Sequence, residues 1–254
     1  MSRGYDGSPP TVILDAADLD EVATYKLLIG GILPRAIGWV STQSADGVAN
    51  LAPISFFTAV CRKPPMVSLT LQPRSDGVTL KDTLVNIRET GEFVTNLVTF
   101  PHAHATHRSA AEFPPEVDEF EALGLGKEPS AVVRPPRVAG APIAYECVLE
   151  RCLSVGDVGD HVVFGEIVRF HVRDDLYLDR GRIDTGALQP VGRLAAEYTL
   201  VENAFMTPIG EEHVAARSGR RMARLDHRPN DWSPIATSSW SPSGAVSVDE
   251  GALP

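Results

Sequence analysis

The stretch from Gly38 to Phe57 reads GWVSTQSADGVANLAPISFF, and it decides the fold. Its first part alternates between larger and smaller side chains, which predicts a β-strand. Asp46-Gly47 then supplies the chemistry of a tight hairpin turn. The returning segment is apolar in character but is interrupted by polar residues and a proline, so packing alone does not explain it.

Pro53 is the main irregularity of that returning segment. Proline cannot donate to a sheet ladder, so we expect the strand to end or to bulge there and to free nearby backbone groups. These groups, with Asn50 and Ser55, could serve a ligand rich in donors and acceptors, and the small Ala52 would let a flat ring approach. The alternative is an edge strand in which Asn50 and Ser55 are turn residues.

The rest of the chain alternates between β-rich runs and turns. Further strands are predicted within 66–72, 92–98, 141–156 and 161–173, and Gly156 to Asp160 favours an antiparallel turn between the last two. Several strands joined by hairpins, with few helices, predict a mainly β protein built on an antiparallel barrel. No glycine-rich dinucleotide motif follows a strand, which argues against a Rossmann fold.

One helix is predicted after residue 79. Thr79 is a candidate N-cap, Gly91 is placed to end the helix in the left-handed conformation, and Leu80, Leu84 and Ile87 should face the core.

The start of this helix is a candidate anion site. Its unpaired N–H groups favour an anion, Lys81 adds a positive charge and Thr83 a hydroxyl donor, so that a phosphate monoester would be held well. A strand that admits a flat ring, followed by such a helix start, suggests FMN. The alternative is an ordinary capped helix with an exposed lysine.

Several segments together resemble the flavin reductase-like proteins with an FMN-binding split barrel. They are RAIGWVST at 35–42, NLAPISFF at 50–57, the Pro64-Pro65 pair, 81–98, 113–125, 135–147, 159–167 and PVGRLAAEY at 190–198. The likeness spans roughly 25–200, and its specificity lies in the order of many separate segments. One departure is Ala36, where relatives often carry proline.

The resemblance implies a six-stranded antiparallel split barrel with a few peripheral helices. The organisation expected is an N-terminal arm over 1–20, the barrel over 21–204 and an extended C-terminal tail over 205–254. The tail includes a basic patch at 217–228 that could contact a partner subunit, the cofactor or an anionic surface. The resemblance also implies a homodimer with FMN near the subunit interface.

The resemblance further assigns residues to the site. Bordering the isoalloxazine would be Trp39, Val40, Ser41, Thr42, Asn50, Leu51 and Ala52. Ser55 would lie near the ribityl chain or ring edge, and Lys81, Asp82 and Thr83 would line the phosphate end. His161 would lie where nicotinamide docks, and Arg35 could stabilise the negative charge of reduced flavin; a structural role for His161 in its turn is the alternative.

The implied activity is hydride transfer from NAD(P)H to FMN, with reduced flavin passed to a partner monooxygenase. Two alternatives stay open. The protein could be an electron-transfer flavoprotein that retains FMN, or an FMN-dependent oxidase or oxygenase acting on a small organic substrate.

Composition excludes other classes. The chain has 254 residues, of which 43% are hydrophobic, and a formal net charge of -10, which is unfavourable for binding nucleic acid. It shows no apolar run long enough to span a membrane and no signal-like N-terminus, so we expect a cytoplasmic protein. The three cysteines fit no zinc or redox spacing.

Two clusters of side chains are alternative candidates for a functional site. His102, His104 and His107 could bind zinc, but no partner has metal-ligand spacing, so no metal is expected. The carboxylates between Glu116 and Glu121 are expected to form a solvated loop, and Glu146 is expected to face outward or to pair with an arginine.

Overall fold

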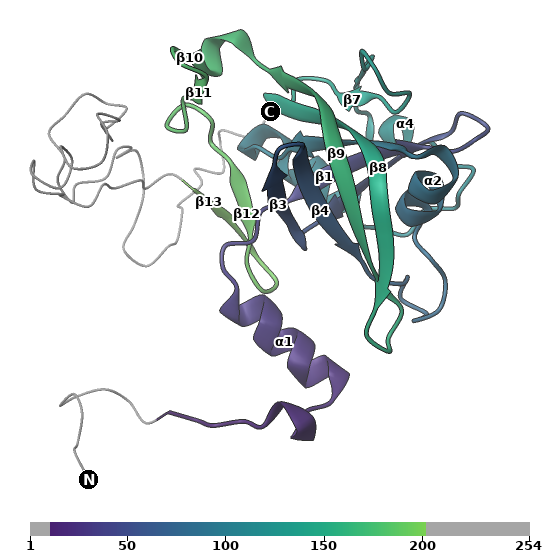
Figure 1. The fold of residues 1–254 in the computed structure, drawn as a ribbon, viewed down its shortest axis with the longest axis vertical. Coiled ribbons are helices and arrows are strands. Elements are labelled where there is room, and N and C mark those ends of the chain that lie inside the picture. The colour runs from purple at the N-terminus through teal and green to yellow at the C-terminus, as the bar shows by residue number, and fades with distance from the viewer. Residues whose placement is uncertain (1–10, 202–254) are drawn as a thin grey trace, which may run out of the picture.

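A computed structural model describes residues 11–201, so the expected arm is seen only from residue 11, and the tail predicted over 205–254 lies outside the described residues. The principal sheet has seven antiparallel strands in the order β2-β1-β5-β8-β9-β4-β3 (Figure 1). Their bounds are β1 Gly38–Gln43, β2 Ala49–Ile54, β3 Phe57–Arg62, β4 Pro65–Leu71, β5 Glu92–Leu97, β8 Ile143–Val155 and β9 Asp160–Val172. This is the predicted antiparallel split-barrel class with one more strand than the six expected, because β3 begins only three residues after β2 ends.

Helices and short hairpins surround this sheet. The helices are α1 Glu21–Gly31, α2 Asp82–Thr90, α3 Ala103–Arg108 and α4 Glu119–Leu123, with single 3-10 turns at Ala16–Asp18, Phe100–His102 and Asp174–Leu176. The hairpins pair β6 Lys127–Glu128 with β7 Arg137–Val138, β10 Tyr177–Leu178 with β11 Arg182–Ile183, and β12 Val191–Arg193 with β13 Tyr198–Leu200. Within 11–201, no helix combines the length and apolar composition needed to cross a membrane.

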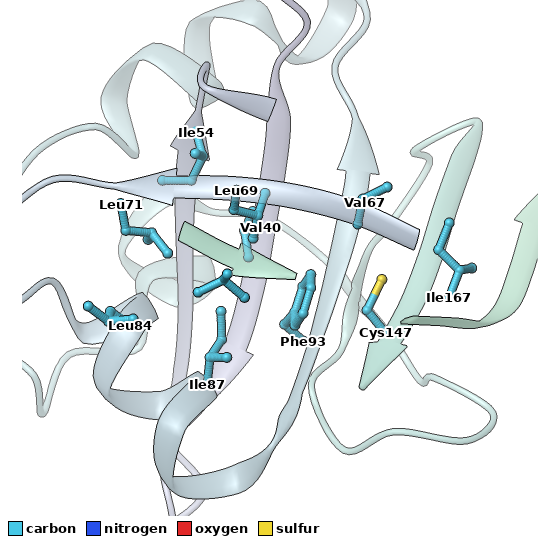
Figure 2. Close-up of a cluster of buried hydrophobic side chains, with 11 residues drawn as sticks. Val40, Ile54, Val67, Leu69, Leu71, Leu84, Ile87, Phe93, Cys147 and Ile167 are labelled. Carbon is cyan, nitrogen blue, oxygen red and sulfur yellow. The ribbon is translucent and has the colours of Figure 1, made fainter. Parts of the chain in front are cut away.

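Alternation along the strands places most of the buried apolar side chains in two large clusters, beside two smaller ones. Val40, Leu69 and Phe93 point into the barrel, where Leu84 and Ile87 of α2 close one end of the cluster (Figure 2). Trp39 lies on the opposite face of β1, packed with Leu51, Phe120 and other residues of a second cluster. The predicted core-facing side of α2 is therefore confirmed, and successive residues of β1 face opposite sides, as a strand requires.

The hairpin between β1 and β2 follows its predicted turn chemistry, with Gly47 at a positive φ of 92°. At Pro53 the prediction of a break or bulge is wrong. The strand continues to Ile54 in regular register, with Pro53 opposite Trp39. Because β2 pairs only with β1 in the sheet, the missing N–H of Pro53 can fall on the open edge.

The start of α2 also differs from the prediction. Lys81, not Thr79, occupies the N-cap position, and no side chain caps the helix there. Thr79 instead donates its N–H and hydroxyl to Asp76 in the preceding turn, at 2.8 Å for the N–H. Gly91 ends the helix with a φ of 72°, as predicted.

Candidate functional site

A pocket, here called the β2 pocket, lies between the open edge of β2 and the start of α2. Its cavity volume is about 90 Å³, and the space that also includes its open mouth is about 470 Å³. Its walls come from four segments that are distant in sequence: Asn50 and Ala52–Ile54 of β2, Arg74, Lys81–Thr83, and the 109–113 segment with Glu119. Five of the predicted cofactor-binding residues thus lie together: Asn50, Ala52, Lys81, Asp82 and Thr83.

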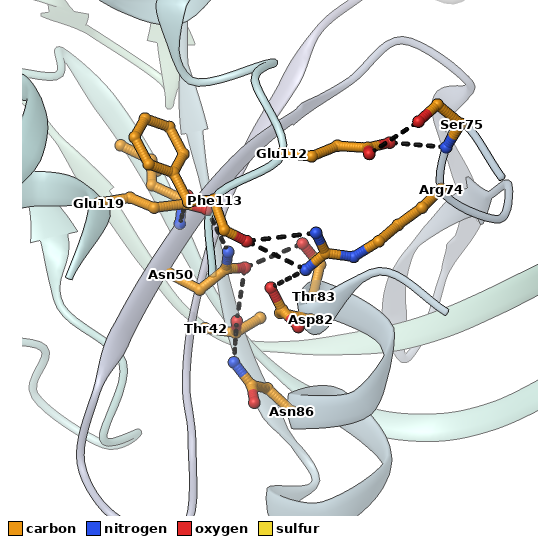
Figure 3. Close-up of polar contacts among 11 residues, drawn as sticks. Thr42, Asn50, Arg74, Ser75, Asp82, Thr83, Asn86, Glu112, Phe113 and Glu119 are labelled. Carbon is orange, nitrogen blue, oxygen red and sulfur yellow. Dashed lines mark hydrogen bonds and ion pairs between the residues drawn. The ribbon is translucent and has the colours of Figure 1, made fainter. Parts of the chain in front are cut away.

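A chain of buried hydrogen bonds fixes the Asn50 amide at the base of this pocket (Figure 3). Its Oδ1 accepts from the hydroxyls of Thr42 at 3.1 Å and Thr83 at 2.9 Å. Thr42 in turn accepts from Asn86 Nδ2 at 3.0 Å. The network ties β1, β2 and α2 together, so that Asn50 is held in one orientation.

Glu119 completes the network from the other side. Its two carboxylate oxygens accept from Asn50 Nδ2 at 2.9 Å and from the N–H of Leu51 at 2.6 Å. Burial raises the pKa of Glu119 to about 7, even though both hydrogen bonds favour the charged form. The expectation of a solvated acidic loop is wrong for this residue, which occupies an open-edge N–H of β2.

The neighbouring carboxylate of Asp118 explains how Glu119 is placed. The Asp118 side chain caps α4 by accepting from the N–H of Phe120 at 3.0 Å, and it pairs with Lys127. Glu119 is the first residue of that helix, so the cap directs it inward. The sequence Asp118-Glu119-Phe120, with a capping residue directly before the glutamate, is the local feature that could have indicated this inward position.

The start of α2 forms the polar end of the pocket. Among the described residues, no acceptor reaches the N–H groups of Asp82 and Thr83, and no carboxylate pairs with Lys81. Asp82 forms an ion pair with Arg74, whose guanidinium also donates to the carbonyl of Phe113 at 3.2 Å. Burial raises the pKa of Asp82, and Arg74 opposes that rise.

The outer wall is held by contacts between two loops. Glu112 accepts from the N–H and hydroxyl of Ser75 at 2.7 and 2.9 Å. Trp39 Nε1 donates to Ser109 Oγ at 2.8 Å, which anchors the other end of the 109–113 segment to β1. This segment belongs to the 101–142 excursion, which could be expected to roof a substrate pocket, although no motif in it marked residues 109–113 as the lining.

Four other predicted residues of β1 and β2, named below, are not among those that line this pocket. Trp39, Val40 and Leu51 have fully buried side chains, and Ser41 donates to the carbonyl of Pro136 at 2.5 Å. The backbone of β1 is paired with β2 on one side and β5 on the other. Of these two strands, only β2 can offer main-chain groups to a ligand, because its outer edge is open.

Arg35 and Ser55 lie together but beyond the lining of the β2 pocket. Arg35 Nη1 donates to Ser55 Oγ at 2.8 Å, and Nη2 donates to the carbonyl of Leu194. Arg35 is 7% exposed. Its own segment pairs with Arg193 rather than with the pocket walls.

His161 also lies outside the pocket lining. Its Nδ1 is 3.0 Å from Arg88 Nη2 and 3.1 Å from Ser154 Oγ. Burial and the adjacent Arg88 lower the pKa of His161. The geometry describes a neutral histidine that connects α2 to the β8–β9 hairpin.

Two of the three histidines that could have bound zinc pack against different aromatic side chains. His102 packs against Trp39, and His107 meets the ring of Tyr198 edge-on. No group of three or more potential metal ligands is present in the part of the chain that the structure describes.

Residues 30–187 match the model of the flavin reductase-like domain, which is more than half of the chain. The chain belongs to the flavin reductase-like family. An uncharacterized protein of Aquifex aeolicus strain VF5 is 40% identical to this family member over 181 residues, covering 71% of this chain and 91% of the relative. The resemblance found in the sequence is confirmed.

Two solved structures extend the comparison. Nitrilotriacetate monooxygenase component B from Bacillus cereus is 35% identical with a TM-score of 0.75, covering 79% of this flavin reductase-like chain and all of that one. The 2-nitrobenzoate 2-nitroreductase NbaA of Pseudomonas fluorescens is 29% identical with a TM-score of 0.70, covering 78% and 96% of the two chains.

Proposed function

We propose that this protein is an NAD(P)H-dependent flavin reductase that binds FMN in the β2 pocket. The observation that carries the proposal is the meeting of an open strand edge with an uncapped helix start. The N–H groups of Asp82 and Thr83, the Thr83 hydroxyl and Lys81 would hold the phosphate. Ala52 and Pro53, which bring no bulky side chain to the edge, would admit the ring.

The charges of the pocket fit an anionic cofactor. Asp82 is paired with Arg74, which leaves the charge of Lys81 for a ligand. Glu119, with its pKa of about 7, is partly protonated at neutral pH. The net charge at the helix start is therefore compatible with a phosphate.

When bound, FMN supplies the acceptor for a hydride, with its two electrons, from NAD(P)H. The residues of the chain would bind and orient. Asn50, whose side chain is held by Thr42, Thr83 and Glu119, keeps the base of the pocket rigid. Glu119 holds a proton on a carboxylate oxygen below about pH 7. Trp39, Val40, Ser41, Thr42 and Leu51 support the pocket from behind, so their direct contact with flavin stays a prediction.

We further propose a homodimer, with reduced flavin passed to a separate monooxygenase. Helix α1 has no buried residue, although Val22, Leu27 and Leu28 in the helix and Ile32 directly after it are apolar and exposed. A second copy of the chain would cover such a helix. Similarity to the component B of a monooxygenase system supports the partner. The free cysteines fit the reducing cytoplasm.

The decisive experiment is flavin binding by wild type and Lys81→Met, measured by quenching of flavin fluorescence with FMN and with riboflavin. We expect Lys81→Met to raise the Kd for FMN about tenfold, equivalent to about 1.4 kcal/mol, and to leave riboflavin unchanged. Lys63→Met, at an exposed turn, is the matched control. Equal affinity of the wild type for FMN and riboflavin would contradict the assignment of the phosphate.

A second candidate is an FMN-retaining enzyme that reduces a small organic substrate. It is favoured by the similarity to a protein named as a 2-nitrobenzoate nitroreductase. Steady-state oxidation of NADPH and NADH with excess free FMN separates the two. Saturable turnover of free FMN supports the reductase, whereas turnover only with a nitroaromatic acid and bound FMN supports the second candidate.

A further inference from the structure

Two arginines from distant parts of the chain lie side by side beyond the end of β2. The backbones of Arg35 and Arg193 exchange two hydrogen bonds, each 2.9 Å long. Arg35 precedes β1 and Arg193 ends β12, so the fold itself brings the two residues together.

Among residues 11–201, the contacts of these guanidinium groups are with neutral groups. Arg35 donates to a hydroxyl and a carbonyl, those of Ser55 and Leu194. The Arg193 guanidinium lies 4.5 Å from the centroid of the Tyr198 ring, and that of Arg35 lies 5.9 Å from the Phe56 ring. Within residues 11–201, no carboxylate forms an ion pair with either arginine.

The pair also has unused donors. Arg35 Nε and Arg193 Nη1 are buried and find no hydrogen-bond partner among the residues that the structure describes, and Arg35 as a whole is 93% buried. Arginine cannot shed its proton under ordinary conditions, so two unpaired charges here are costly. Burial and the neighbouring Arg193 lower the pKa of Arg35 accordingly. An anion would satisfy both the charges and the donors.

We propose that Arg35 and Arg193 form a phosphate-monoester subsite, separate from the start of α2. The proposal rests on the flavin reductase function proposed above. A phosphate monoester carries -1.5 to -2 charges near pH 7, which roughly matches two guanidinium groups, whereas a carboxylate carries one. Guanidinium groups also suit the oxygens of phosphate geometrically.

The position of the subsite indicates which phosphate it takes. Thr83, at the start of α2, is hydrogen-bonded to Asn50 of β2. Arg35 is hydrogen-bonded to Ser55, five residues after Asn50 in the sequence. At about 3.3 Å per residue of extended chain, these points are at most about 16 Å apart. If the phosphate of FMN binds at the start of α2, the arginine pair remains free to bind a second phosphate monoester. In a flavin reductase, that group would be the 2′-phosphate of NADPH. The other source of the same group is FMN itself, bound in the reverse direction.

The test compares wild type and Arg193→Gln in ligand pairs that differ by one phosphate monoester. NADP⁺ against NAD⁺ and FMN against riboflavin are titrated, using thermal shift for the nucleotides and flavin fluorescence for the flavins. We expect Arg193→Gln to weaken NADP⁺ about tenfold or more, with NAD⁺, FMN and riboflavin unchanged. Arg62→Gln, on the exposed strand β3, is the control.

The other possible results of these titrations either reassign the phosphate subsite or overturn it. Weaker FMN with unchanged riboflavin would keep the phosphate subsite and assign it to flavin. A variant that binds all four ligands as the wild type does, or weakens all four equally, would overturn the subsite. Lys81→Met tests the α2 start independently, so the proposed function can survive if the arginine subsite fails. Arg35→Lys, which keeps the charge at the more buried position, is a second variant if Arg193→Gln does not fold.

Discussion

Two buried glutamates show how partners decide the state of a carboxylate. Glu146 is fully buried, contrary to its expected exposure, and burial alone would raise its pKa. Three backbone N–H groups, from Ala131 to Val133, and the ring of His171 outweigh that effect and hold the pKa at about 2. Glu119 has only two donors, and burial prevails. The first glutamate anchors a loop as an anion, whereas the second titrates near neutrality.

Glu119 therefore makes stability depend on pH. Because its folded pKa of about 7 lies above the ordinary value of 4.5, its protonated form stabilises the fold fully below pH 4.5. That contribution is lost as pH rises through about 7 and amounts to at most ~3 kcal/mol. Glu119→Gln should remove this dependence. Urea unfolding of the full chain at pH 5 and pH 8 measures it.

The control for this prediction is Glu116→Gln, which changes an exposed carboxylate of the same segment. It should keep the pH dependence of the wild type. An unchanged difference between pH 5 and pH 8 in Glu119→Gln would contradict the assignment.

At the scale of elements, the barrel interior depends on a close approach between β9 and β5. A Cβ added at Gly165 would lie 2.2 Å from the Phe93 ζ carbon, and that ring is fully buried. Neither the ring nor the paired strands can move aside without disturbing the core. Glycine at this position is therefore a packing requirement, not a turn.

Gly165→Ala should destabilise the protein by about 1–3 kcal/mol through overpacking. Gly30→Ala is the matched control, because nothing lies within 4 Å of its added Cβ in α1 and alanine favours a helix. Thermal and urea unfolding of both variants measure the effect. A Gly165→Ala protein as stable as the wild type would show that Phe93 can reorient.

Most elements could be predicted because their signals are local. Alternation, Asp46-Gly47 and Gly91 mark strands, turn and helix end within a few residues. β3 was missed because Phe56 and Phe57 read as a continuation of β2, and the α2 cap was misplaced because Asp76 captures Thr79. In the pocket, Asn50 and Lys81–Thr83 carry recognisable chemistry. Arg74 and Glu119 do not, since their roles arise from contacts across 39 and 68 residues of sequence.

At the scale of the whole molecule, α1 stands away from the barrel with its apolar side chains uncovered (Figure 1). Asp20 caps its first turn by accepting from the N–H of Ala23 at 2.7 Å, so the helix is locally well defined. Tyr25 makes a distant ring contact with Phe56, at 6.4 Å between centroids. A helix with this composition stabilises the protein only when another surface covers it.

Replacing Leu27 and Leu28 together with glutamate should convert the proposed dimer into a monomer. Light scattering after size exclusion would then give the chain mass of 27.3 kDa in place of twice that value. Val78→Glu, at an exposed position outside α1, should leave the dimer intact. A wild type that is already monomeric at micromolar concentration would contradict the dimer.

The wall contributed by residues 109–113 is tied down at its two ends by Ser109 and Glu112, while Arg74 binds the main-chain oxygen of Phe113. None of these hydrogen bonds uses the side chains of Ala110, Ala111 or Phe113. Evolution, or a designer with a small combinatorial library, could reshape the cavity at these three positions at little cost to folding.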